Sequence, residues 1–429
     1  MKVTRTIKHP QLQETVHLAT AANGLQVALI PTPGFHTAAA HFGLRFGGND
    51  LKFIMPGDHE CEVPTGSAHY LEHKLFEGRE EKVFDRFNRL GADFNGGTSF
   101  CTTTYYFSTA NNFDECLEVL VDFVQYPLIT DERVDKERGI IEQEVRMYQD
   151  SPGYRGTFLL HEAMYETHAV RVGPGGTLAD VARINATDLQ HCYDGFYVPQ
   201  AMRLVLAGDF DVDDVLKKLQ PLLRDDNPAS AKRVSDDATS ARATDWLEEE
   251  FAVTRPHVFI GYPQKKMRVD GQDRLHQRIV ASLVIDLMFG KSSELRQKLY
   301  EAEIVDDSFG AYWSSDESWG HVIMSGVCDA PKSFVADISG ECKEFIANKI
   351  KSEDFERLRK AAWGGIVSGL QTPSAIASSV LSSMLSGNEI FSALDELQSI
   401  SLDELQSAAE DMFDESKRAV AVLMPLKSD

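Results

Sequence analysis

The feature that most constrains the fold of this 429-residue chain is a repeat that relates its two halves. Four residues of one stretch recur 216 positions later as the same or similar side chains: Ile184, Leu189, Gln190 and Tyr197 correspond to Ile400, Leu405, Gln406 and Phe413. Each stretch is predicted to be a helix that leads to a strand, at residues 202–207 and 418–424. Matching segments at a fixed offset are typical of a duplicated structural unit, so we expect two related domains.

Residues 226–243 (DNPASAKRVSDDATSARA) are the best linker candidate, because they are polar, small and free of apolar periodicity. The predicted organisation is an N-terminal metal-bearing domain at 1–225, the linker, and a homologous domain without a metal site at 244–429. Strands are predicted in both halves, at residues 26–30, 37–43, 102–108 and 257–260. Helices are predicted between them, at residues 68–76, 83–90, 113–124, 275–288 and 353–370. This mixture indicates an α+β fold built of layers.

The run His69-Tyr70-Leu71-Glu72-His73 carries the chemistry of the first half. Two histidines four residues apart lie on one face of a helix, so both imidazoles can reach one metal ion. Glu72 lies beside them, where it can take a proton from an activated water. The pattern His-x-x-Glu-His is the inverted form of a zinc-peptidase signature.

The second half contains a degenerate copy of this segment. Leu295 and Leu299 stand where the first copy has Leu71 and Leu75, so the packing residues are kept. In contrast, the positions of the histidines and the glutamate are occupied by Ser293, Arg296 and Gln297. We therefore expect a duplicated fold in which the second copy has lost the site; accidental similarity of two amphipathic helices is the alternative.

A third metal ligand is expected on the helix predicted at residues 131–149. Its buried stripe is formed by Val134, Ile141, Val145 and Tyr148. Glu137 and Glu144 are seven residues apart along the edge of that stripe, and buried carboxylates are rarely unpaired. A catalytic zinc site needs three protein ligands and an open position for water. We therefore predict Glu144 as the third ligand and Glu137 as the partner of a ligand histidine; the alternative is two glutamates on a solvated helix shoulder.

With His69, Glu72, His73, Glu137 and Glu144, the chain resembles the pitrilysin/insulinase family of inverted-motif zinc peptidases, which includes the mitochondrial processing peptidases. The resemblance covers most of the chain and is strongest over residues 60–210. Residues 91–99 resemble the family's substrate-edge strand, and Phe196-Tyr197 and Ala207-Gly208-Asp209 resemble the end of its first domain. The chain is most similar to the small bacterial members that work as paired chains. The resemblance implies two homologous domains facing each other across a cavity.

The predicted ligand set implies peptide-bond hydrolysis, with one Zn²⁺ per chain and Glu72 as the general base. The residues expected to bind an extended peptide substrate along their main chain are Asn95, Gly96, Gly97, Thr98 and Ser99. The family usually has small and aromatic residues after the asparagine. Because two glycines stand there in this chain, the site is expected to accept a bulkier group; turn or bulge geometry is the alternative reason for the glycines.

A second departure from the family concerns a partner chain. Active members commonly need an arginine and, seven residues later, a tyrosine from the second-half fold. Tyr300 and Asp307 stand at these positions, and neither can make the contacts of the residue it replaces. We therefore expect the metal-bearing subunit of a heterodimer, nearly inactive alone. The alternatives are an independent enzyme, such as a homodimer, a narrow protease that matures one peptide precursor, and a non-catalytic scaffold subunit.

Composition limits the remaining function classes. The 43 basic and 66 acidic residues give a net charge of −23, which argues against nucleic-acid or anionic-membrane partners. The sequence shows no apolar run of membrane-spanning length and no signal-peptide pattern. Six scattered cysteines have no metal-type spacing. We therefore expect a cytoplasmic protein with reduced thiols.

Overall fold

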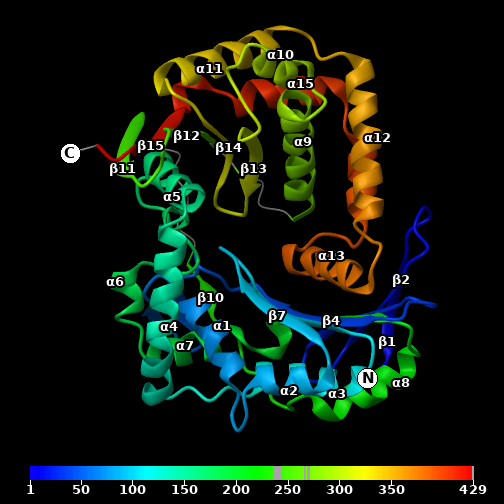
Figure 1. The fold of residues 1–429 in the computed structure, drawn as a ribbon. Helices are drawn as coiled ribbons and strands as arrows, with labels where there is room; N and C mark the ends of the chain where they lie inside the picture. The colour runs from blue at the N-terminus through cyan, green and yellow to red at the C-terminus, as the bar shows by residue number, and fades with distance from the viewer. Residues whose placement is uncertain (235–242, 265–266, 268–270, 428–429) are drawn as a thin grey trace. The chain divides into compact units, whose positions relative to one another are not determined.

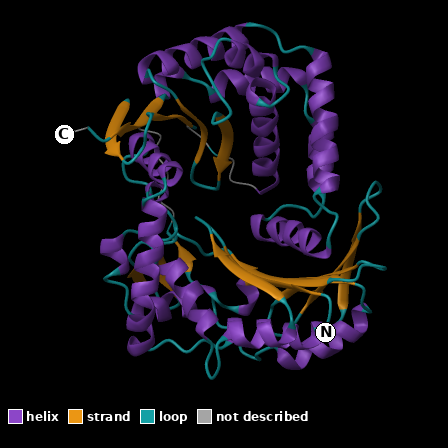
Figure 2. Cartoon of the chain, in the orientation of Figure 1, coloured by secondary structure: helices purple, strands orange, loops and turns teal. Residues whose placement is uncertain are grey.

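The computed structural model describes residues 1–234, 243–264, 267 and 271–427. These residues form two compact units, each of which combines a mixed sheet with helices, as the predicted α+β class requires (Figure 1, Figure 2). The first unit contains Met1–Val145, Val172–Ser235 and Val367–Phe391. The second contains Arg146–Arg171, Asp236–Ile366 and Ser392–Asp429.

The first unit is built on a seven-stranded sheet. Its strands, in spatial order, are β1 (Val3–Lys8), β2 (Thr15–Thr20), β3 (Gln26–Pro31), β9 (Met202–Gly208), β4 (Ala38–Leu44), β8 (Thr103–Thr109) and β7 (Asp93–Thr98). Only β3 and β9 run parallel; the other neighbours are antiparallel. A small sheet contains β10 (Lys232–Arg233), β5 (Lys52–Met55) and β6 (His59–Glu62). In this order β7 is an edge strand of the large sheet.

Helices cover both faces of the large sheet. The helices of the first unit are α1 (Ser67–Glu77), α2 (Val83–Leu90), α3 (Phe113–Gln125), most of α4 (Asp131–Gln149), α6 (Leu178–Val181), α7 (Ala186–Phe196), α8 (Val212–Leu219) and α13 (Pro373–Ser386). On β3, Val27 and Leu29 join the core shared with α1 and α3, whereas Ala28 and Ile30 join a cluster with α13. Successive side chains on a strand point to opposite faces, so these two clusters lie on opposite sides of the sheet (Figure 1).

The second unit has a five-stranded sheet. Its strands, in spatial order, are β11 (Trp246–Phe251), β15 (Ala419–Pro425), β12 (His257–Pro263), β14 (Gly320–Val327) and β13 (Gly310–Ser315). Its helices are α5 (Pro152–Met164), α9 (Gly271–Phe289), α10 (Glu294–Glu301), α11 (Pro331–Ala347), α12 (Ser352–Ser368), α14 (Ser392–Ser399) and α15 (Leu402–Met412). His161, His168 and His321 are buried in this unit.

The two sheets confirm the duplication. The order β3-β9-β4-β8-β7 in the first unit corresponds to β11-β15-β12-β14-β13 in the second. In each order the first two strands are parallel and the later pairs antiparallel. The aligned helices also correspond, since α1 matches α10 and α7 matches α15. All the helices and strands predicted above are present, with ends that differ by a few residues.

The units exchange one helix each, which the sequence did not indicate. Helix α5 belongs to the first half of the chain but packs on β12 and β15 of the second unit. Helix α13, its counterpart in the second half, packs on β4 and β9 of the first unit. Equivalent glycines permit both contacts: Gly43 on β4 faces Leu381 of α13, and Gly261 on β12 faces Leu160 of α5. The compact units therefore differ from a simple division at residues 226–243.

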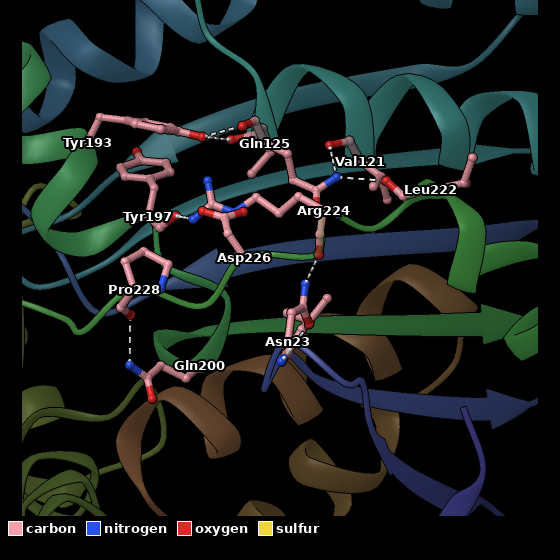
Figure 3. A network of polar contacts seen from close by, with 12 residues as sticks. Asn23, Val121, Gln125, Tyr193, Tyr197, Gln200, Leu222, Arg224, Asp226 and Pro228 are labelled. Atoms are coloured by element: carbon pink, nitrogen blue, oxygen red, sulfur yellow. Dashed lines mark hydrogen bonds and ion pairs between the residues drawn. The ribbon is translucent and has the colours of Figure 1, made fainter.

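The start of the predicted linker is bound to the first unit. Figure 3 shows the polar network around it: Arg224, just before the linker, donates to the Tyr197 carbonyl at 2.9 Å, and Gln200 donates to the carbonyl of Pro228, within the linker, at 3.0 Å. Farther along, β10 pairs with β5. Residues 235–242 of the predicted linker lie outside the described residues. Among the residues described, no helix has the length and apolar character that a membrane span requires.

Candidate metal centre

Helices α1 and α4 bring the candidate ligands together. Helix α1 buries Leu71 and Leu75 in the core of the first unit, which turns its polar residues at the intervening positions toward α4. Two contacts fix this packing at the N-terminal part of α4. The Tyr70 hydroxyl donates to the Val134 carbonyl at 2.5 Å, and the buried Lys74 ammonium donates to the Arg133 carbonyl at 2.7 Å. The register between the two helices is therefore set by hydrogen bonds as well as by apolar packing.

The structure brings His69, His73 and Glu144 to one point. Their potential ligand atoms all lie within 4.8 Å of one another. The Nε2 atom of His69 lies 3.6 Å from Glu144 Oε1, and the Nε2 atom of His73 lies 3.2 Å from Glu144 Oε2. Both imidazoles thus present the same ring nitrogen toward a single carboxylate. This donor set of two imidazoles and one carboxylate fits a zinc ion.

Glu137 lies behind the second histidine. Its Oε1 atom is 3.2 Å from His73 Nδ1, the ring nitrogen on the opposite side from Glu144. Burial lowers the pKa of His73, but the hydrogen bonds to Glu137 and Glu144 and the charge of Glu72 outweigh burial and raise that pKa to about 9. The hydrogen bond from His73 lowers the pKa of Glu137. A carboxylate at Nδ1 fixes the ring orientation and leaves Nε2 free to coordinate.

Glu72 lies beside the three ligands and is almost completely buried, with 7% of its surface exposed. Burial raises the pKa of this carboxyl, although the nearby His69 and a hydrogen bond from Thr98 oppose that shift. The Thr98 hydroxyl donates to Glu72 Oε2 at 2.8 Å. A methyl group on Gly96 would lie 2.9 Å from Glu72 Oε1 and 2.6 Å from the Phe76 ring, so the carboxylate reaches the main chain of β7 only because residue 96 is glycine.

Strand β7 carries the residues predicted to bind substrate. Within the described part of the chain it pairs only with β8, which leaves its other edge open. Ser99 donates its N–H to the Thr102 carbonyl, so by the alternation of an antiparallel ladder Asn95 and Gly97 also face β8. The main-chain groups of Gly96 and Thr98 then face outward. In agreement, the Gly96 N–H is bound by the Asn95 side chain at 2.9 Å and not by β8.

The second copy of the motif has structural contacts in place of metal ligands. Ser293 caps the start of α10, and Arg296 donates to the carbonyls of Phe289 and Phe309, both at 3.1 Å. Tyr300 and Asp307, which are expected to stand where active family members carry an arginine and a tyrosine, are both exposed in the second unit.

Two residues near the site were not recognised from the sequence in the roles that the structure shows. Thr98 was predicted only as a main-chain contact for substrate, whereas its side chain binds Glu72. Gly175, in the turn at residues 173–176, lies beside His69. In addition, Tyr148 was predicted to be buried but is 39% exposed, because the last turn of α4 leaves the first unit and Tyr148 stacks on Tyr154, with ring centroids 5.4 Å apart.

Comparisons with known proteins agree with this arrangement. Residues 58–173 match the family model described as insulinase (peptidase family M16), and residues 183–362 match the model described as the peptidase M16 inactive domain. The chain is 31% identical to the uncharacterised zinc protease YmfH of Bacillus subtilis, over 98% of this chain and 99% of that protein. It is 25% identical to a protein named as mitochondrial-processing peptidase subunit beta in Arabidopsis thaliana, over 54% of this chain and 45% of that protein.

A solved structure extends this likeness to the complete fold. The crystal structure of an M16-like peptidase from Alicyclobacillus acidocaldarius superposes with a TM-score of 0.92 at 30% identity, over 97% of this chain and 99% of that one. The likeness thus includes both units, the one with the candidate metal centre and the one without it. The chain belongs to the insulinase family, peptidase family M16.

Proposed function

We propose that this chain is a zinc-dependent metalloendopeptidase that cleaves short or unfolded peptides, as the catalytic subunit of a heterodimer. The observation that carries the proposal is the convergence of His69, His73 and Glu144 within 4.8 Å, with Glu72 beside them. Relatives named as zinc proteases, similar over nearly the whole length of this chain, support the assignment of the metal. The three ligand side chains are 12%, 22% and 23% exposed, so substrate can reach the site.

Each residue has a distinct part in the proposed hydrolysis. His69, His73 and Glu144 hold one zinc ion, and Glu137 orients His73 through Nδ1. When bound, zinc supplies Lewis-acid activation of a water molecule and of the scissile carbonyl. Glu72 takes a proton from the attacking water and delivers it to the leaving amine. Its burial favours this role, because a carboxyl with a raised pKa is a better base and a better acid near neutral pH.

Strand β7 places the substrate in this proposal. An extended peptide that pairs with the open edge forms main-chain hydrogen bonds to Gly96 and Thr98, whose groups face outward. Glu72 Oε1 lies directly behind Gly96, so a scissile bond next to this residue is within reach of the base. Asn95 releases the Gly96 N–H when the peptide binds, and its amide is then free to hold a substrate carbonyl.

A partner chain is proposed because of two residues in the second half of the sequence. Tyr300 and Asp307 cannot provide the cationic and phenolic contacts that active members commonly use, and an aspartate close to a developing oxyanion would oppose it. A homologous chain that carries the arginine and the tyrosine would complete the site. The similarity to a protein named as a subunit of a processing peptidase supports a paired arrangement.

The test is zinc content together with cleavage of a pool of short unfolded peptides, by the chain alone and with a related chain from the same source. We expect one zinc per chain and cleavage only with the related chain. Glu72→Gln should keep zinc and lower turnover by at least about 100-fold, whereas Glu80→Gln, an exposed control, should change neither. Full cleavage by the isolated chain would overturn the heterodimer. Absence of both zinc and cleavage would overturn the peptidase and favour a scaffold subunit.

A further inference from the structure

The helix that carries His69 begins in an unusual way. Gly66, the residue before α1, has a φ of +91°, and no side chain caps the helix. The main chain here packs directly on the glycine turn at residues 173–176. A methyl group on Gly66 would lie 2.7 Å from the Gly175 carbonyl oxygen, and one on Gly176, which has a φ of +80°, would lie 2.4 Å from the Thr65 carbonyl oxygen. The two segments therefore touch main chain to main chain, which only glycines permit.

Hydrogen bonds among three polar residues hold the start of α1 against the glycine turn. The Thr65 hydroxyl donates to Asp180 Oδ2 at 2.6 Å and accepts from the Thr177 N–H at 3.2 Å. The Thr177 hydroxyl in turn accepts from the Asp180 N–H at 3.1 Å, which caps helix α6. The ring of hydrogen bonds ties Thr65, two positions before the first residue of α1, to the first turn of α6. We call Thr65, Thr177 and Asp180 the latch.

The latch is close to one metal ligand in particular. His69 is the third residue of α1, only four positions after Thr65. A methyl group on Gly175 would lie 3.9 Å from His69 Nδ1 and 3.7 Å from Val145, the neighbour of Glu144, so the glycine turn lies close to both ligand-bearing helices. The Nδ1 atom of His69 is buried without a hydrogen-bond partner, whereas Nδ1 of His73 is held by Glu137. Among the described residues, no acceptor therefore fixes the His69 ring from its Nδ1 side.

We infer that Thr65, Thr177 and Asp180 are positioning residues for the zinc site: they fix the start of α1 and thereby hold His69 Nε2 toward Glu144. This inference rests on the proposed zinc site. It assigns to the helix start the role that Glu137 has for His73. The consequence is that loss of the Thr65 hydroxyl weakens zinc binding although Thr65 does not touch the metal ligands.

The test is the zinc dissociation constant of the full-length chain, measured by competition with a chelator, together with the melting temperature of the metal-free protein. Thr65→Val removes the hydroxyl at nearly constant volume and should weaken zinc binding about tenfold. Thr65→Ser keeps the hydroxyl and should restore wild-type affinity. Thr20→Val, at an exposed position of β2, is the matched control and should have no effect.

The outcomes separate the inference from the proposed function. Weaker zinc binding in Thr65→Val with a metal-free melting temperature close to wild type, and recovery in Thr65→Ser, supports the latch. Unchanged zinc affinity in a folded Thr65→Val protein overturns it. If Thr65→Val does not fold, Asp180→Ala removes the same hydrogen bond from outside α1 and decides in its place. A wild-type chain that binds no zinc overturns the proposed function itself.

Discussion

At the scale of single residues, the two histidines of the site are held in different ways. His73 has a carboxylate on each ring nitrogen, Glu137 on Nδ1 and Glu144 on Nε2. His69 has Glu144 on Nε2 and, within the part of the chain that the structure describes, no partner on its buried Nδ1. A carboxylate partner raises the basicity of a ligand imidazole and fixes its orientation. Substitutions around the two histidines should therefore have different consequences.

Glu137→Gln should weaken zinc binding by roughly 10- to 100-fold, because the amide cannot stabilise the His73 ring as a carboxylate does. It should also lower the pKa of His73 in the metal-free protein, since the hydrogen bond to Glu137 raises that pKa. Chelator competition measures the first effect, and histidine NMR titration the second. Glu132→Gln, an exposed glutamate in the first turn of α4, serves as the control. Equal zinc affinity in the Glu137→Gln and Glu132→Gln variants would show that Glu137 does not support zinc binding.

At the scale of helices and strands, close glycine contacts decide how the exchanged helices pack. Gly156 of α5 faces Phe259 of β12, and a methyl group there would lie 2.0 Å from the ring. The ring is rigid and buried, so the helix would have to move outward. Gly153, one turn earlier on the same helix, has open space around it.

Gly156→Ala should therefore lower the free energy of unfolding by about 1–3 kcal/mol, through overpacking. Gly153→Ala is the matched control, and it should leave stability unchanged or raise it by up to about 1 kcal/mol, because alanine favours the helix. Urea unfolding of both variants provides the comparison. A stable Gly156→Ala protein would show that α5 does not pack on β12 as closely as described.

An ion-pair cluster joins three helices of the second unit. His276 on α9 contacts Glu396 on α14 through Nδ1 and Glu404 on α15 through Nε2, both at 2.7 Å. Burial lowers the pKa of His276, but the two carboxylates outweigh burial and raise it above its ordinary value. Both contacts are strongest when the imidazole is protonated.

The pH dependence of this stabilisation follows from the raised pKa of His276. Because the folded pKa lies above the unfolded value of about 6.5, the stabilisation is complete below pH 6.5 and is lost as the pH rises through the folded pKa. His276→Gln should therefore destabilise the protein at pH 6 by roughly 1 kcal/mol or less, and the difference from wild type should vanish at alkaline pH. A difference that grows with pH would contradict the ion-pair assignment.

At the scale of the whole molecule, each half of the chain contributes one helix to the unit that is built mainly from the other half. Helix α13 belongs to the second half but packs in the first unit, and α5 belongs to the first half but packs in the second unit. One face of the first sheet, at Val16, Ala28, Ile30, Val205 and Ala207, is covered by α13 from the second half. A fragment of residues 1–225 lacks that helix and would leave this face in water, at a cost that grows with the exposed apolar area.

We therefore expect the fragment of residues 1–225 to aggregate or to bind a hydrophobic dye, and co-expression with residues 226–429 to restore a compact protein. Size-exclusion chromatography and circular dichroism of the fragment, alone and in the co-expressed pair, are the measurements. A monomeric fragment that unfolds cooperatively would show that the first unit is stable without α13. In either case, the three candidate metal ligands are all contained in the fragment.

Sequence reasoning predicted the candidate ligands that the structure brings together, because each pair lies on one helix. His69 and His73 are one turn apart, and Glu137 and Glu144 are two turns apart, so local helix geometry alone places each pair on a common face. The same reasoning was wrong for Tyr148, since periodicity continues to the end of α4 whereas burial does not. It also missed the Thr98 hydroxyl on Glu72, because a strand pattern shows which face a side chain is on but not what it meets there.

The sequence by itself determined the duplication, the order of helices and strands, and the family, since these depend on local periodicity and on motifs within a few helical turns. Only the tertiary structure decided that α4 packs on α1 in the register that joins Glu144 to both histidines, that β7 is an edge strand, and that α5 and α13 are exchanged. The physical reason is that these arrangements depend on contacts between residues far apart in the chain. Such contacts are selected by packing and hydrogen bonding in the folded state, and they have no periodic signature in the sequence.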